Sequence, residues 1–183
     1  MMIRNEIASS AVEADLSRPS PLDRPKERNT AKILVIEDDV AIRQVICLFL
    51  QLSGFVVAEA QDGRQAISIL PEFCPDLVVL DLMMRPVDGW EVLNWLRDHP
   101  FTPPLPVLIL TALTQLIEQV HGLEAGAVEY MTKPTQPSRV VERIHAILSL
   151  SVEQRAMLRS KRIDERRSVL SRISAPQPDE FMF

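Results

Sequence analysis

The stretch Leu77-Val78-Val79-Leu80-Asp81 contains four aliphatic residues in a row, followed by a single carboxylate. So short and apolar a run predicts a β-strand that is buried on both faces. Asp81 then lies where the strand leaves the sheet. In open parallel sheets, ligands bind at the carboxyl ends of strands, so Asp81 is a candidate site residue. An Asp in this position can also simply cap a turn, and the rest of the chain decides between these interpretations.

Two further runs have the same apolar character and also end in polar residues. Ile33-Leu34-Val35-Ile36 is followed by Glu37-Asp38-Asp39, and Val107-Leu108-Ile109-Leu110 is followed by Thr111. Each run therefore predicts another buried strand with a polar group at its carboxyl end.

Two mixed segments, residues 55–60 and 128–131, predict strands with one less buried side. Apolar residues at helical spacing predict helices between and after the strands, the second of which we expect Pro71 to end. Five alternations of strand and helix predict an α/β fold, a doubly wound five-stranded parallel sheet with helices on both faces. The mixed second and fifth strands suit its edges, as in the order 2-1-3-4-5. The predicted helices cover residues 42–53, 63–70, 90–99, 113–125 and 137–148.

In this order, the ends of four strands meet at one rim of the sheet. Three carboxylates there, those of Glu37, Asp38 and Asp81, repel one another, since two unit charges ~4 Å apart cost on the order of 4 kcal/mol at an effective dielectric near 20. Such a cluster needs a cation or raised pKa values, and an all-oxygen site open to water suits Mg²⁺. Thr111 and Lys133 add a hydroxyl and a movable positive charge. A carboxylate nucleophile, a divalent cation, a Lys and a hydroxyl are the parts needed to accept a phosphoryl group.

Four stretches of the chain resemble the receiver domains of two-component response regulators, and the resemblance covers about residues 31–150. Their spacing is also similar: Asp38 and Asp81 are 43 residues apart, and Asp81 precedes Thr111 by 30 residues and Lys133 by 52. The resemblance implies a flavodoxin-like fold of five βα units. The matching stretches are Ile33-Leu34-Val35-Ile36-Glu37-Asp38-Asp39, Leu80-Asp81-Leu82-Met83-Met84 with Asp88-Gly89, Leu110-Thr111-Ala112, and Tyr130-Met131-Thr132-Lys133-Pro134.

The resemblance also implies a role for each matching residue at the metal site. Asp81 would be the phosphoacceptor and a Mg²⁺ ligand. Glu37 and Asp38 would be the acidic metal-binding pair, with Asp38 the direct ligand, and the backbone carbonyl of Met83 would be a further ligand.

Three further residues would act on the phosphoryl group or respond to it. By the resemblance, Thr111 would donate a hydrogen bond to the group and Lys133 would pair with it. Tyr130 is similar to the aromatic residue whose rotation accompanies activation, and the alternative is a packing residue of an edge strand. One departure is Arg85, which stands where the family usually has Pro, with Pro86 one position later. This change affects the loop beside the site, where Arg85 could touch the phosphate or a partner.

The function implied is a signalling switch rather than an enzyme, phosphorylated on Asp81 by a sensor histidine kinase or a phosphotransfer protein. One alternative is a phosphatase or phosphotransferase of the haloacid dehalogenase type, which also uses an Asp after a strand. That family needs a second Asp two residues later, where this chain has Met83. Another alternative is a degenerate receiver that only binds partners, which the intact set of site residues disfavours.

Composition limits the location and the partners. Residues 31–150 carry eight basic and fifteen acidic residues, which makes a poor surface for nucleic acid. No apolar run approaches the roughly 20 residues that span a bilayer, and the N-terminus lacks a signal-peptide stretch. Cys47 and Cys74 lie in apolar sequence without metal-ligand spacing, so we expect a reducing cytoplasm.

The two flanks of the predicted domain differ in character. Residues 1–30 hold three prolines among polar residues and predict a disordered leader. Residues 151–183 hold seven basic and five acidic residues and predict a solvated helical tail that continues the last helix. A partner-binding or self-associating helix, which would make a homodimer, is the alternative. No helix-turn-helix pair fits the tail, so we do not expect direct DNA binding, and the downstream target is not indicated.

Overall fold

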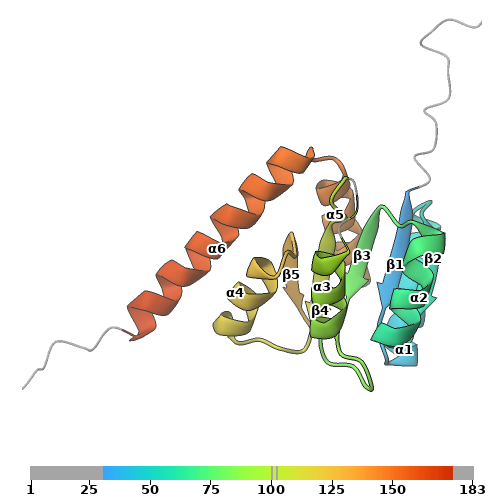
Figure 1. The fold of residues 1–183 in the computed structure, drawn as a ribbon, viewed down its shortest axis with the longest axis horizontal. Helices are drawn as coiled ribbons and strands as arrows, with labels where there is room; N and C mark the ends of the chain where they lie inside the picture. The colour runs from blue at the N-terminus through green and yellow to red at the C-terminus, as the bar shows by residue number, and fades with distance from the viewer. Residues whose placement is uncertain (1–30, 100, 102, 175–183) are drawn as a thin grey trace, which may run out of the picture.

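The computed structural model describes residues 31–99, 101 and 103–174, and within them forms a five-stranded parallel sheet (Figure 1). The strand order is β2-β1-β3-β4-β5, so the predicted doubly wound sheet is confirmed, with the two mixed strands at its edges. The expected disordered leader, residues 1–30, lies outside the described residues. The strands are β1 (Lys32–Ile36), β2 (Val56–Ala60), β3 (Leu77–Leu80), β4 (Val107–Thr111) and β5 (Glu129–Thr132).

Helices cover both faces of the sheet because side chains alternate along each strand. Ile33 and Val35 of β1 pack with one pair of helices, and Leu34 and Ile36 pack on the opposite face. The first face carries α1 (Val40–Leu52) and α5 (Pro137–Leu148). The second carries α2 (Gly63–Phe73), α3 (Gly89–Asp98) and α4 (Leu116–Glu124).

Two predicted helix boundaries are wrong for local reasons. Pro71 lies inside α2, whose last turn continues to Phe73 and ends at Cys74 in a left-handed conformation with φ 49°. A proline near the end of a helix removes only one intrahelical bond, so the turn around it can still close. The fourth helix begins at Leu116 rather than Leu113, because residues 113–115 form the loop after β4. Cys74 is also exposed, contrary to the expected apolar surroundings.

The C-terminal tail forms a separate helix, α6 (Val152–Ser174), and does not continue α5 as predicted. Residues 149–151 separate the two helices, and Ser151 caps the N-terminus of α6. The Ser151 hydroxyl accepts from the Gln154 amide at 3.2 Å, and the Gln154 side chain accepts from the Ser151 amide at 2.8 Å. This reciprocal capping box starts α6 in a new direction. Figure 1 shows α6 running back alongside α4 and β5.

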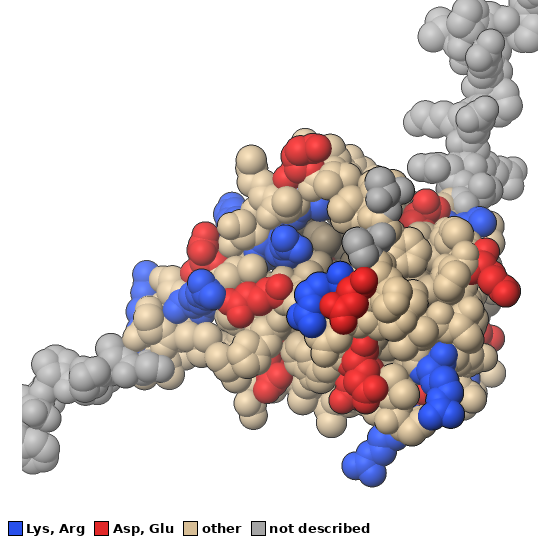
Figure 2. Space-filling model, viewed as in Figure 1, with Lys and Arg blue, Asp and Glu red and all other residues tan. Residues whose placement is uncertain are grey.

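The arginines of α6 dock the helix onto the domain, so the predicted solvated tail is wrong for this face of α6. Arg162 donates to the Val128 carbonyl at 2.7 Å and pairs with the Glu129 carboxylate at 2.6 Å. Arg166 donates to the Gln119 side chain at 2.8 Å. Figure 2 shows basic side chains beside acidic ones over this region. Among residues 31–174, as far as they are described, no helix is long and apolar enough to span a membrane.

Candidate functional site

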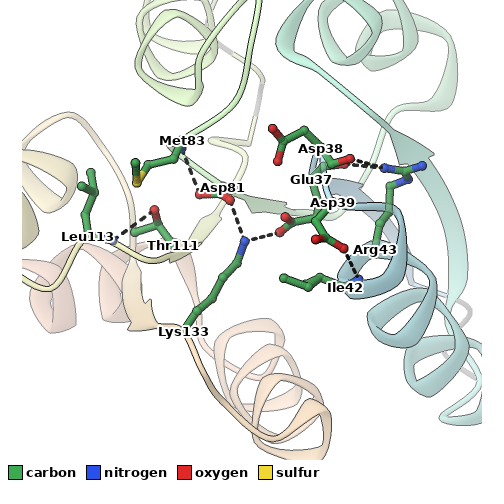
Figure 3. A network of polar contacts seen from close by, with 10 residues as sticks. All are labelled: Glu37, Asp38, Asp39, Ile42, Arg43, Asp81, Met83, Thr111, Leu113 and Lys133. Carbon is green, nitrogen blue, oxygen red and sulfur yellow. Dashed lines mark hydrogen bonds and ion pairs between the residues drawn. The ribbon is translucent and has the colours of Figure 1, made fainter.

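The carboxyl ends of the strands bring the predicted site residues together (Figure 3). Glu37 and Asp38 follow β1, and Asp81 follows β3. One carboxylate oxygen from each of these three residues lies within 4.8 Å of the others. Thr111 is the last residue of β4, and Lys133 directly follows β5. The parallel sheet therefore gathers side chains that are far apart in the sequence.

Lys133 joins two of the carboxylates. Its Nζ donates to Glu37 Oε2 at 2.5 Å and to Asp81 Oδ2 at 2.6 Å. Burial by itself would lower the pKa of Lys133. The hydrogen bonds that Lys133 donates to Asp81 and Glu37, together with their negative charges, outweigh this effect and raise the pKa above its ordinary value. The single positive charge of Lys133 therefore offsets only part of the negative charge of Glu37 and Asp81.

Glu37 is not fully satisfied by this arrangement. Burial raises the pKa of Glu37 above its ordinary value, although the hydrogen bond and charge of Lys133 act in the opposite direction. Within the part of the chain that the structure describes, Glu37 Oε1 is the buried side-chain oxygen without a hydrogen-bond partner. An unpaired buried acceptor beside two further carboxylates fits a hard cation with oxygen ligands such as Mg²⁺.

The two aspartates after Glu37 have different tasks. Asp39 is the N-cap of α1, and its side chain accepts from the Ile42 amide at 3.0 Å. Asp38 is exposed and contributes its carboxylate to the acidic cluster. This geometry supports the prediction that Asp38 rather than Asp39 holds the metal.

The loop after β3 orients Asp81. The Met83 amide donates to Asp81 Oδ1 at 3.0 Å, so the two oxygens of Asp81 have different partners. A Cβ built on Gly89 would lie 2.2 Å from the Asp81 carbonyl oxygen. Only glycine permits this close approach of α3 to the loop. In the sequence, the available signal for Gly89 is its place in the Asp88-Gly89 pair, which belongs to the stretches that resemble receiver domains.

Thr111 and Tyr130 both contact Leu113 in the loop after β4. The Thr111 hydroxyl is 3.5 Å from the Leu113 amide, and the Tyr130 hydroxyl donates to the Leu113 carbonyl at 3.1 Å. Burial raises the pKa of Tyr130 to about 12. The Tyr130 ring lies against Gly122 of α4 and is only 5% exposed, so it already occupies an inward position.

Arg85 lies on the surface of the loop after β3. Its peptide bond to Pro86 is cis, and its side chain forms no ion pair with the residues that the structure describes. The predicted contact with a phosphate or a partner stays a prediction.

The comparisons with known proteins agree with this geometry. Residues 33–145 match the model of the response regulator receiver domain. Over 117 residues, the chain is 38% identical to the DNA-binding dual master transcriptional regulator RpaA of Synechocystis sp., covering 64% of this chain and 48% of that protein. It is 39% identical to the phosphate regulon transcriptional regulatory protein PhoB of Escherichia coli, covering 64% of this chain and 51% of that one.

The fold gives the same assignment. The structure of the Francisella response regulator 1452 receiver domain matches with a TM-score of 0.61 and 31% identity, over 64% of this chain and 96% of that one. This chain spans about half the length of the two curated relatives that it matches. The chain belongs to the response regulator receiver domain family.

Proposed function

We propose that this chain is a phosphorylation-dependent signalling switch that accepts a phosphoryl group on Asp81 in the presence of Mg²⁺. The observation that carries the proposal is Lys133 bridging Glu37 and Asp81 beside the unpartnered Glu37 oxygen. A nucleophile, a neutralising ammonium and a place for a cation are thereby combined at one point. We assign this activity to residues 31–150 as one receiver domain, with α6 docked against it.

Each residue of the site would have a separate role in the transfer of the phosphoryl group. The Met83 amide holds Asp81 Oδ1, so Oδ2 is the oxygen that forms the bond to phosphorus, while the bond from phosphorus to the donor breaks. Lys133 moves its hydrogen bond from Asp81 to a phosphoryl oxygen, and Thr111 donates to another. Glu37, Asp38, Asp81 and the Met83 carbonyl would hold Mg²⁺, which would supply positive charge next to the phosphoryl oxygens.

The proposed phosphoryl donor is a sensor histidine kinase or a phosphotransfer protein. A groove of about 600 Å³ between α1 and α5 runs up to Lys133 and has mostly apolar walls that include Val45 and Val140. Further out on α1, Leu48 and Leu52 are exposed apolar side chains. An apolar surface beside a phosphoacceptor suits a donor protein that must bring its phosphohistidine to Asp81.

Two earlier expectations about partners change. RpaA is DNA-binding by its own description, so the expectation of no direct DNA contact is withdrawn. Arg162 and Arg166 of α6 are held by residues of their own domain, so the homodimer through this helix is not part of the proposal. The downstream target stays open.

We propose a switch rather than a haloacid dehalogenase-type enzyme because of what stands two residues after Asp81. Met83 contributes a backbone amide to Asp81, while its side chain is 55% exposed and has no acid-base group. We also propose the cytoplasm as the location, since Cys47 and Cys74 are both free thiols.

The proposal is tested with acetyl phosphate and Mg²⁺, with intact mass spectrometry as the readout. Wild type should gain a phosphoryl adduct that is absent from Asp81→Asn. The matched control is Asp76→Asn, because Asp76 lies at the other end of β3 and accepts from the Lys32 amide at 2.7 Å. Asp76→Asn should be phosphorylated like wild type. An equal adduct on Asp81→Asn and wild type would refute Asp81 as the acceptor.

A further inference from the structure

Arg43 is a basic residue near the N-terminus of α1, four residues after the Asp39 cap. A positive charge there is unfavourable, because the N-terminal end of a helix already carries partial positive charge. The Arg43 side chain is nevertheless only 11% exposed. A specific set of partners must therefore hold it in place.

Those partners are the backbone of the acidic pair and one edge-strand carboxylate. One terminal nitrogen of the Arg43 guanidinium donates to the Glu37 carbonyl at 2.7 Å and to the Asp38 carbonyl at 3.3 Å. Its Nε donates to Glu59 Oε2 on β2 at 3.1 Å. Figure 3 shows Arg43 on one side of the Glu37–Asp38 backbone and Asp81 with Lys133 on the other.

We propose that Arg43 is a positioning residue for the Mg²⁺ site, which aims the carboxylates of Glu37 and Asp38 at Asp81 by holding their backbone carbonyls. This inference rests on the proposed function, since it concerns the cation of that same site. Because the peptide unit is planar, a fixed carbonyl also fixes the direction of the chain on either side of it. The side chains of both residues are thereby directed from a rigid backbone.

The simpler interpretation is that Arg43 only makes an ion pair with Glu59. The Glu59 side chain is 57% exposed, and exposed ion pairs contribute little to stability. The bond to the Glu37 carbonyl is shorter and partly buried, and its loss would leave that carbonyl without this donor. The carbonyl contacts therefore account better for the burial of Arg43 than the ion pair does.

Titration of the purified protein with Mg²⁺ in a calorimeter tests the proposal. Arg43→Gln should weaken Mg²⁺ binding about 10- to 100-fold, the usual cost of losing a group that orients a metal ligand. Glu59→Gln is the matched control, because it removes the ion pair and leaves both carbonyl contacts; its affinity should stay that of wild type. Arg43→Lys keeps the charge but lacks the guanidinium fork, and should lie between the two.

A second readout does not depend on the metal. Amide hydrogen exchange of residues 37–39 in Mg²⁺-free protein should accelerate in Arg43→Gln and not in Glu59→Gln. Wild-type exchange and affinity in Arg43→Gln would overturn the positioning role, as would equal losses in Glu59→Gln. If wild type itself binds no Mg²⁺, the proposed function fails at its metal step, and the exchange experiment still decides whether Arg43 holds this backbone.

Discussion

Glu37 and Glu129 are two buried glutamates, each paired with a basic side chain from a later part of the chain. Glu37 is 2% exposed and Glu129 is 6% exposed. Glu37 meets Lys133 at 2.5 Å, and Glu129 meets Arg162 at 2.6 Å. By burial and pair distance alone, the two sites are nearly the same.

They differ in how completely the carboxylate is satisfied. Glu129 Oε1 accepts from the Tyr130 amide at 3.1 Å, while Oε2 meets Arg162 and, at 3.8 Å, Arg143. Glu37 shares its Lys with Asp81 and leaves one oxygen without a partner among the described residues. A fully satisfied pair can fix an element in place, whereas the unpartnered oxygen in the acidic cluster fits the cation that we propose for this site.

The largest effect expected from this difference is on phosphorylation. Lys133→Met should slow phosphorylation of Asp81 roughly 100-fold or more, the usual cost of removing one group that stabilises transition-state charge. Arg162→Met should leave the rate close to that of wild type. Initial rates of adduct formation from acetyl phosphate at saturating Mg²⁺ measure both. A comparable loss in Arg162→Met would show that the Glu129 pair belongs to the site.

The next largest effect is on the free energy of unfolding, and here the Glu129–Arg162 pair is the one that matters. Arg162→Met should lower the free energy of unfolding by about 3 kcal/mol, because it leaves Glu129 buried without its close partner. Adding Glu129→Gln should recover most of this loss in urea unfolding, and the double-mutant cycle gives the coupling. Additive losses would contradict the pairing.

Deleting α6 altogether should lower the free energy of unfolding by less than Arg162→Met does, since the deletion opens Glu129 to water. It should leave phosphorylation of Asp81 intact.

Mg²⁺ should stabilise the folded protein through the acidic cluster. At a concentration 100 times its dissociation constant, the gain in unfolding free energy is about 2.7 kcal/mol. Asp38→Ala should lose this gain. Asp39→Ala should keep it while losing about 1 kcal/mol from the cap of α1. Unfolding curves with and without Mg²⁺ separate the two, and the reverse pattern would show that Asp39 is the ligand.

The smallest effect on stability, and the most specific, concerns Thr111. Its contact with the Leu113 amide is 3.5 Å long, so Thr111→Ala should change stability by less than about 1 kcal/mol through that contact. The variant should still accept phosphate on Asp81 but lose the response of β5, because Tyr130 meets the same loop residue. NMR shifts of residues 128–131, with and without a phosphoryl mimic, report that response. A wild-type response in Thr111→Ala would contradict the coupling.

The sheet and the residues at its rim could be predicted from the sequence. Apolar runs such as Leu77-Val78-Val79-Leu80 mark strands that are buried on both faces, and the mixed composition of β2 and β5 marks the edge strands. These signals can be found in the sequence because the burial of each strand is reflected in that strand's own residues. Once the strand order is known, parallel strands necessarily bring Asp81 and Lys133 to the same edge. These features depend on local patterns and on one rule of topology.

Only the tertiary structure decided where α6 packs and which partners Arg43 and Glu129 contact. A charged helix satisfies its side chains in water as well as against a protein surface, so its sequence does not say which applies. The Arg162 side chain is largely buried because it pairs with the buried carboxylate of Glu129, which lies 33 positions earlier and requires a positively charged partner. Arg43 likewise meets carbonyls, which every residue carries and no sequence pattern distinguishes. Contacts of this kind are set by where the backbone passes, and that is known only when the chain has folded.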